Sequence, residues 1–220
     1  MADFRKRKAY YFWDKQIVKI ATPLGKLLVN TPITPNMVTL LNLILIFPLV
    51  CLAAWFKNYI GIAILVNVYI ILDFLDGGLA RMKEMFSKYG AVLDTITDYL
   101  MYSVGYIFIA YAIDTHWYFI VFSMVAQWLY AIVTTVYIAP KIRKLDTFNK
   151  TKIKLFFENK LHIILGMDVS MESLLISVTI WFSFRKYLFF VCGIFWIIDL
   201  VFRLLELHIL NNTKNRNKEL

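Results

Sequence analysis

Four aspartates stand close together in residues 73–98, which read DFLDGGLARMKEMFSKYGAVLDTITD. Asp73 and Asp76 are three positions apart, and a helix would carry both on one face. The same holds for Asp94 and Asp98, which are four positions apart. A carboxylate in an apolar segment is costly and normally faces a cavity, a partner or an ion. Two acidic helix faces could therefore oppose each other around a cation.

The residue types around these aspartates predict a site for a hard divalent cation. Carboxylate oxygens suit magnesium, manganese or calcium, and this stretch contains no His or Cys that would favour zinc. Gly77 and Ala80 share the face of the first acidic pair and leave its surface nearly bare beside Arg81. A flat ligand could therefore lie close to the backbone there.

The spacing D-x2-D-G-x2-A-R-x8-G-x3-D-x3-D resembles the signature of the CDP-alcohol phosphotransferase family, and every position of that signature is matched between Asp73 and Asp98. The resemblance implies an integral membrane enzyme, also called a CDP-alcohol phosphatidyltransferase, of phospholipid biosynthesis. Such an enzyme moves a phosphorylated alcohol from a CDP-linked donor to the hydroxyl of an acceptor alcohol and releases CMP. The resemblance also implies a homodimer whose two sites work separately.

The same resemblance implies roles for individual residues. A diphosphate donor and four carboxylates repel each other, so cations must lie between them. Divalent ions, Mg²⁺ or Mn²⁺ and two per site, are expected on Asp73, Asp76, Asp94 and Asp98. Asp98 is also the expected catalytic base, because it matches the family's fourth aspartate and could reach an incoming hydroxyl. The residues expected to bind the nucleotide donor are Asp73, Gly77, Ala80, Arg81, Gly90, Asn36 and Thr39.

Asn36 and Thr39 belong to the segment 33–39, which reads ITPNMVT and opens the first predicted span. Pro35 near a helix start, with Thr or Asn as a cap, explains this segment structurally. Members of the family often carry a similar Pro-Asn-x-x-Thr, which makes Asn36 and Thr39 candidates for contacting the nucleotide. Both interpretations stay open at this point.

Composition predicts a membrane protein independently of the motif. Hydrophobic residues make up 60% of the chain and charged residues only 18%, which is far more apolar than a typical soluble domain. We expect an all-α integral membrane protein with an N-terminal interfacial amphipathic helix and six transmembrane helices. The expected spans are 37–56, 60–80, 90–112, 117–139, 169–184 and 187–209. The expected regions are the interfacial helix in 1–34, a transmembrane catalytic domain in 35–210 and a polar cytoplasmic tail in 211–220.

The basic residues predict the orientation of the chain. With the N-terminus inside, all of the 24 Lys and Arg residues except Lys57, Arg185 and Lys186 lie on or next to the cytoplasmic face. This orientation places the aspartates at the cytoplasmic ends of the second and third spans. The sequence looks similar to bacterial or archaeal members of the family, so we expect a multi-pass protein of the cell membrane.

The net charge of +9 could also indicate a protein that binds nucleic acid. The basic residues of the chain are in loops or next to spans, where the preference for positive charge on the cytoplasmic side already accounts for them. No nucleic acid is therefore expected as a partner. The basic segment 140–167 fits the same explanation. A sharper alternative is that Lys141, Arg143 or Lys144 binds a phosphate or acidic group of the acceptor.

Two other classes of protein remain as alternatives. A divalent-cation transporter could also carry carboxylates in a helix bundle, but it would not need Gly77, Ala80 and Arg81 at fixed offsets. A catalytically inactive membrane scaffold is the other alternative. The sequence also leaves the substrates open: the donor could be CDP-diacylglycerol or a small CDP-alcohol, and the expected partners are that donor, an acceptor alcohol and membrane lipid.

Overall fold

The computed structural model describes residues 10–143, 160, 163–164 and 166–216. Its elements are helices, apart from one short parallel pairing between β1 (Tyr10–Tyr11) and β2 (Ile163–Ile164). The predicted all-α class is therefore confirmed for the described residues, with this two-residue pairing as the exception.

Most helices join end to end into long rods. The N-terminal helix is α1, Phe12–Leu28. The first rod consists of α2 (Pro35–Leu41), the π-helical η1 (Asn42–Ile46) and α3 (Phe47–Trp55). The second is α4 (Tyr59–Met82), and the third consists of α5 (Lys88–Leu100), the π-helical η2 (Met101–Gly105) and α6 (Tyr106–Ala112). The later elements are α7 (Trp117–Ile132), the π-helical η3 (Val133–Ile138), α8 (Ala139–Arg143), α10 (Val169–Thr179), the 3₁₀ turn η5 (Ser183–Tyr187) and α11 (Leu188–Arg216).

Side-chain caps fix where the first three rods begin. Thr34, Asn58 and Ser87 each accept a hydrogen bond from a backbone N–H in the first turn that follows, at 3.3, 3.0 and 2.9 Å. These bonds satisfy donors that a helix start leaves without a partner inside the helix. The cap at Ser87 matters most for function, because it sets where α5 starts and hence where Asp94 and Asp98 lie.

Within the part of the chain that the structure describes, four helical segments are long and apolar enough to cross a membrane, namely 35–55, 59–82, 117–141 and 183–208. They agree with four of the six predicted spans and indicate a multi-pass membrane protein.

The other two predicted spans are not confirmed. The span predicted at 90–112 is a continuous helix from Lys88 to Ala112, but its first half carries the polar and acidic residues of the motif. The span predicted at 169–184 contains α10, whose 11 residues reach only about 16 Å, against an apolar bilayer core of about 30 Å. The count of six spans therefore stays a prediction.

Helix α1 uses one face to pack on the protein and leaves another exposed. Ile17, Ala21 and Gly25 are buried, and α1 packs against α4 and α10. Two apolar side chains of the same helix, Ile20 and Leu24, are 50% and 38% exposed. A helix is present at Phe12–Leu28, and the prediction that it is an interfacial helix stays a prediction.

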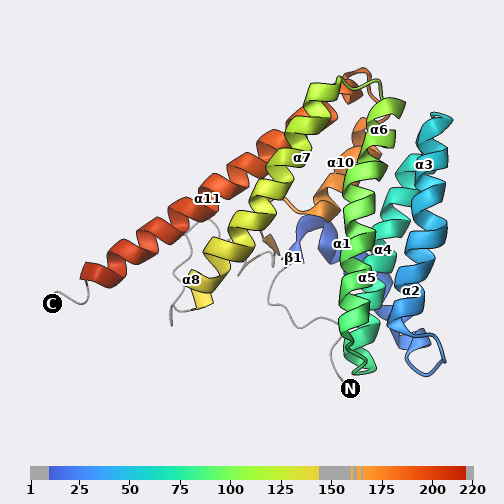
Figure 1. The fold of residues 1–220 in the computed structure, drawn as a ribbon, viewed down its shortest axis with the longest axis horizontal. Helices are drawn as coiled ribbons and strands as arrows, with labels where there is room; N and C mark the ends of the chain where they lie inside the picture. Colours follow the sequence, from blue (N-terminus) through green and yellow to red (C-terminus); the bar gives the residue numbers. More distant parts are fainter. Residues whose placement is uncertain (1–9, 144–159, 161–162, 165, 217–220) are drawn as a thin grey trace.

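Figure 1 shows two groups of long helices. The rods α2–α3, α4 and α5–α6 run side by side, and α2 packs against both α4 and α5. Helices α7 and α11 also run side by side and lean away from the first group toward α8. Helix α11 continues to Arg216, so the tail predicted from residue 211 begins as helix.

Candidate functional site

Three of the four aspartates meet between α4 and α5. Asp73 and Asp76 lie on α4 and Asp94 lies on α5, and one carboxylate oxygen of each lies within 4.8 Å of the other two. Asp76 is buried, while Asp73 and Asp94 are half-buried. Oxygen atoms at such separations can surround one hard cation. The donor set therefore fits the predicted magnesium or manganese ion.

Helix α2 completes this site from the side. The hydroxyl of Thr39 donates a hydrogen bond of 2.7 Å to Oδ2 of Asp76, and Thr39 is itself buried. Asn36, one turn earlier, lies beside Gly90 of α5. The capping interpretation of this segment also holds, but it applies to Thr34 rather than to Asn36 or Thr39. Both predicted residues therefore lie at the site, and their contact with a nucleotide stays a prediction.

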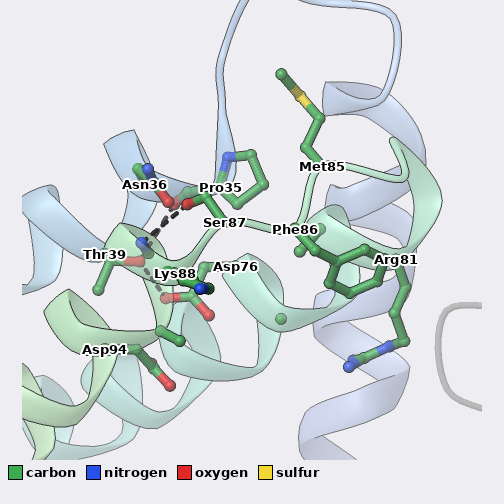
Figure 2. Close-up of a pocket in the computed structure, with 14 residues that line it drawn as sticks. Pro35, Asn36, Thr39, Asp76, Arg81, Met85, Phe86, Ser87, Lys88 and Asp94 are labelled. Atoms are coloured by element: carbon green, nitrogen blue, oxygen red, sulfur yellow. Dashed lines mark hydrogen bonds between the residues drawn. The ribbon is translucent and has the colours of Figure 1, made fainter.

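A cavity of about 520 Å³ opens beside these acids (Figure 2). Most of the residues predicted for the metal and the donor line it, namely Asn36, Thr39, Asp76, Gly77, Ala80, Arg81, Gly90 and Asp94. Its described lining also includes residues that the sequence analysis did not predict for the metal or the donor, namely Pro35, Met85, Phe86, Ser87, Lys88 and Ala91. Of these, Lys88 is the second basic residue of the lining, in addition to Arg81. The cavity thus combines acidic side chains, two basic side chains and small residues. This combination suits a nucleotide diphosphate that is held through a metal ion.

Gly77 and Gly90 shape this cavity in different ways. A Cβ on Gly77 would meet only the guanidinium of Arg81, at 3.7 Å, so the position is open toward the ligand space. A Cβ on Gly90 would lie 2.5 Å from Oδ1 of Asn36 and 2.9 Å from Oγ of Ser87. Gly90 therefore lets α5 approach α2 closely.

The Gly90→Ala variant is expected to lose both stability and donor affinity. The new methyl group must displace Asn36 and the capping hydroxyl of Ser87, and such overpacking costs about 1 to 3 kcal/mol. Thermal unfolding and titration with the CDP donor measure the two effects. Gly77→Ala is the matched control, since its methyl group has room and Ala favours a helix interior over Gly: it should weaken donor binding without lowering the unfolding temperature. Equal unfolding temperatures for the two variants would contradict this account.

Asp98 lies apart from the other three aspartates. It is one helical turn beyond Asp94 on α5, and it is not part of the group whose oxygens lie within 4.8 Å of one another. Its Oδ1 accepts a hydrogen bond of 3.2 Å from the hydroxyl of Tyr69 on α4. Asn42 of η1 in turn donates a hydrogen bond of 3.0 Å to the backbone carbonyl of Tyr69. The roles predicted for Asp98, as a metal ligand and as the catalytic base, both stay predictions.

A second cavity of about 390 Å³ borders Asp98 on the side of α7 and α11. Its wall includes Tyr102, Gln127, Trp128 and Tyr130, which the sequence did not single out. The sequence held one signal for this wall, namely Gln127 in an otherwise apolar segment. A polar residue in such a segment is unusual and often has a functional reason.

The residues predicted to bind the acceptor are only partly described. Lys141 lies at the end of the α7–η3–α8 rod, with its Nζ 3.5 Å from the centre of the Tyr137 ring. Arg143 ends α8, but its side chain and the whole of Lys144 lie outside the described residues. Lys141 is not among the described residues that line the two cavities.

Curated relatives match a limited part of this chain. A phosphatidylinositol phosphate synthase of Corynebacterium glutamicum is 33% identical over 79 residues, which make up 36% of each protein. An archaetidylinositol phosphate synthase of Pyrococcus horikoshii is 39% identical over 85 residues, or 37% of this chain and 45% of the relative. The matches thus span less than half the length of either relative.

Solved structures with a similar fold cover far more of the chain. The phosphatidylinositol phosphate synthase of Mycobacterium tuberculosis in complex with manganese and citrate matches 85% of this chain and 88% of its own, with a TM-score of 0.56 and 16% identity. The same enzyme with CDP-DAG bound matches 86% and 94%, with a TM-score of 0.58 and 16% identity. At this identity the likeness shows the fold alone.

The family model for CDP-alcohol phosphatidyltransferases matches residues 32–185, which is well over half of the chain and includes the whole aspartate motif. The family predicted from the motif is therefore confirmed, and this chain belongs to the CDP-alcohol phosphatidyltransferase family.

Proposed function

We propose that this chain is a metal-dependent membrane enzyme that transfers a phosphorylated alcohol from a CDP-linked donor to an acceptor alcohol and releases CMP. One observation carries the proposal: three carboxylates lie within 4.8 Å of one another, and two of them, Asp76 and Asp94, line a cavity together with Gly77, Ala80 and Arg81. A metal site alone would fit many enzymes. Its position beside a cavity lined by six of the eight signature residues of the family narrows the reaction to this class.

We propose a CDP-linked lipid as the donor and a phosphorylated polyol as the acceptor. One enzyme of similar fold is described with CDP-DAG bound, and the two curated relatives are synthases of inositol phosphate lipids. The cytidine and diphosphate would occupy the cavity of 520 Å³, where Arg81 and Lys88 can balance phosphate charge. The acyl chains would extend into the surrounding lipid.

The proposed chemistry uses the separation of Asp98 from the other acids. Asp73, Asp76 and Asp94 would hold a divalent ion, which when bound neutralises the diphosphate and makes its phosphorus easier to attack. The carboxylate of Asp98 takes the proton of the acceptor hydroxyl. The acceptor oxygen forms a new bond to the β-phosphorus, and the bond from that phosphorus to CMP breaks. Tyr69 holds Asp98 in place through its hydrogen bond of 3.2 Å.

The first test is an assay of CMP release with the whole chain in detergent. With CDP-diacylglycerol, Mg²⁺ and myo-inositol 1-phosphate, we expect release that depends on the acceptor and yields a new lipid by mass spectrometry. Small CDP-alcohols with diacylglycerol serve as the alternative substrate pair. Release of CMP with neither pair, from protein that binds Mn²⁺, would overturn the proposed activity. Metal flux into liposomes without any CMP release would favour the transporter instead.

Orientation and assembly complete the proposal. We propose that the site faces the cytoplasm and that the protein forms a homodimer with one donor site in each copy. The distribution of basic residues supports the orientation, and the resemblance to the family supports the dimer.

A further inference from the structure

The second cavity, beside Asp98, is nearly neutral. Helices α5 and η2 form one wall and helices α7 and η3 another, and Trp196 of α11 closes it. Among the described residues that line this cavity, Asp98 alone carries a charge, and several of the others are hydroxyl-bearing or aromatic. The cavity therefore offers hydrogen bonds and flat apolar faces rather than an ionic site.

Two polar atoms of this wall are buried and unsatisfied. The hydroxyl of Tyr102 and Oε1 of Gln127 have no hydrogen-bond partner among the described residues. Both residues line the cavity, and they are only 8% and 9% exposed. Buried polar groups in proteins are nearly always paired, so each unpaired one needs an explanation. A ligand in the cavity would supply the missing partners.

Two neighbouring aromatic side chains, Tyr106 and Trp196, do have hydrogen-bond partners. The hydroxyl of Tyr106 donates to Oε2 of Glu172 at 2.8 Å, and Nε1 of Trp196 donates to Oε1 of the same carboxylate at 2.9 Å. Glu172 thereby holds the ring of Trp196 in the cavity wall. Tyr99 stacks on Trp128 with ring centres 4.5 Å apart. The wall is thus held rigid while Tyr102 and Gln127 remain available to a ligand.

We infer that Tyr102 and Gln127 determine acceptor specificity by binding hydroxyl groups of the uncharged polyol part of the acceptor, so that another hydroxyl is presented to Asp98. This inference rests on the proposed function. A polyol matches the neutral wall, because its hydroxyls can donate to Oε1 of Gln127 and accept from Tyr102. An alkyl chain would leave both atoms unpaired. A phosphate carried by the acceptor would lie outside this wall, which has no basic side chain among its described residues.

Two variants remove these groups with little change in shape, namely Tyr102→Phe and Gln127→Met. With myo-inositol 1-phosphate as the probe, we expect each to raise the acceptor KM about fivefold, the effect of one hydrogen bond. Binding of CDP-diacylglycerol should stay unchanged. L-Serine, which has a single hydroxyl, should show a smaller change in KM. Tyr111→Phe, at the far end of the same helical rod and 52% exposed, is the matched control.

Stability separates this role from a structural one. Tyr102→Phe removes an unpaired hydroxyl, so its unfolding temperature should be equal to or above that of the parent protein. Tyr106→Phe removes a hydroxyl paired with Glu172 and should unfold at a lower temperature. A drop for Tyr102→Phe as large as that for Tyr106→Phe, with an unchanged acceptor KM, would overturn the inference.

Direct binding distinguishes this inference from the proposed function. Calorimetric titration with myo-inositol 1-phosphate should show weaker binding to both variants than to the parent. Weaker binding without CMP release from the parent would support the cavity assignment and overturn the transfer reaction. CMP release from the parent with unchanged KM in both variants would support the reaction and overturn the role of Tyr102 and Gln127.

Discussion

Asp98→Asn is expected to reduce acceptor-dependent CMP release by about 10²- to 10⁴-fold, the usual contribution of a general base. The amide cannot take a proton from the acceptor hydroxyl. It can still accept the hydrogen bond that Tyr69 now donates to Asp98 at 3.2 Å, so the local geometry should survive. Because Asp98 lies outside the cluster of three acids, binding of the CDP donor and of Mn²⁺ should remain within about twofold of the parent.

Asp76→Asn is the matched control for this experiment. Asp76 is buried within the cluster and accepts a hydrogen bond from Thr39, so its loss should weaken metal binding and donor binding as well as turnover. Equal loss of donor binding in the two variants would mean that Asp98 acts chiefly as a metal ligand. Tyr69→Phe adds a graded test: it should lower kcat far less than Asp98→Asn does and leave the donor KM unchanged, since Tyr69 only positions the carboxylate.

The local spacing of the motif was enough to predict most of the first cavity. Positions three and four apart on a helix share a face whatever the rest of the fold does. Asp76, Gly77 and Ala80 lie three, four and seven positions after Asp73 and therefore share its face, and the structure places these three residues with Arg81 around one cavity. Four of the expected spans coincide with described helices that are long and apolar enough to cross a membrane. They were predictable for a similar reason, since a bilayer requires long apolar helices.

Features that depend on packing between distant helices could not be read from the sequence. Tyr69 belongs to an apolar helix and gains its role only because α4 and α5 bring its hydroxyl to Asp98. The second cavity is lined by residues of α5, η2, α7, η3, α10 and α11, segments that are far apart in the sequence. The short length of α10 was hidden as well, because the apolar residues continue past Thr179, where the helix ends.

Removal of divalent metal is expected to abolish CMP release completely, and Mg²⁺ or Mn²⁺ should restore it. Three carboxylates within 4.8 Å of one another repel when they are not compensated, so the site also opposes folding in the absence of a cation. Saturating metal, at about 100 times its Kd, should stabilise the folded protein by about 2.7 kcal/mol. Thermal unfolding during a Mn²⁺ titration measures this effect without any substrate.

Asp94→Asn should remove both the activity and the stabilisation by Mn²⁺, because it takes away the carboxylate that α5 contributes to the cluster. The same change should raise the unfolding temperature of the metal-free protein, since one of the repelling charges is gone. Asp114→Asn is the control: its carboxylate pairs with Lys57 at 2.7 Å in the loops after α3 and α6, so it should keep the full response to metal. Undiminished CMP release in excess chelator, or a metal response that survives in Asp94→Asn, would contradict a catalytic ion held between α4 and α5.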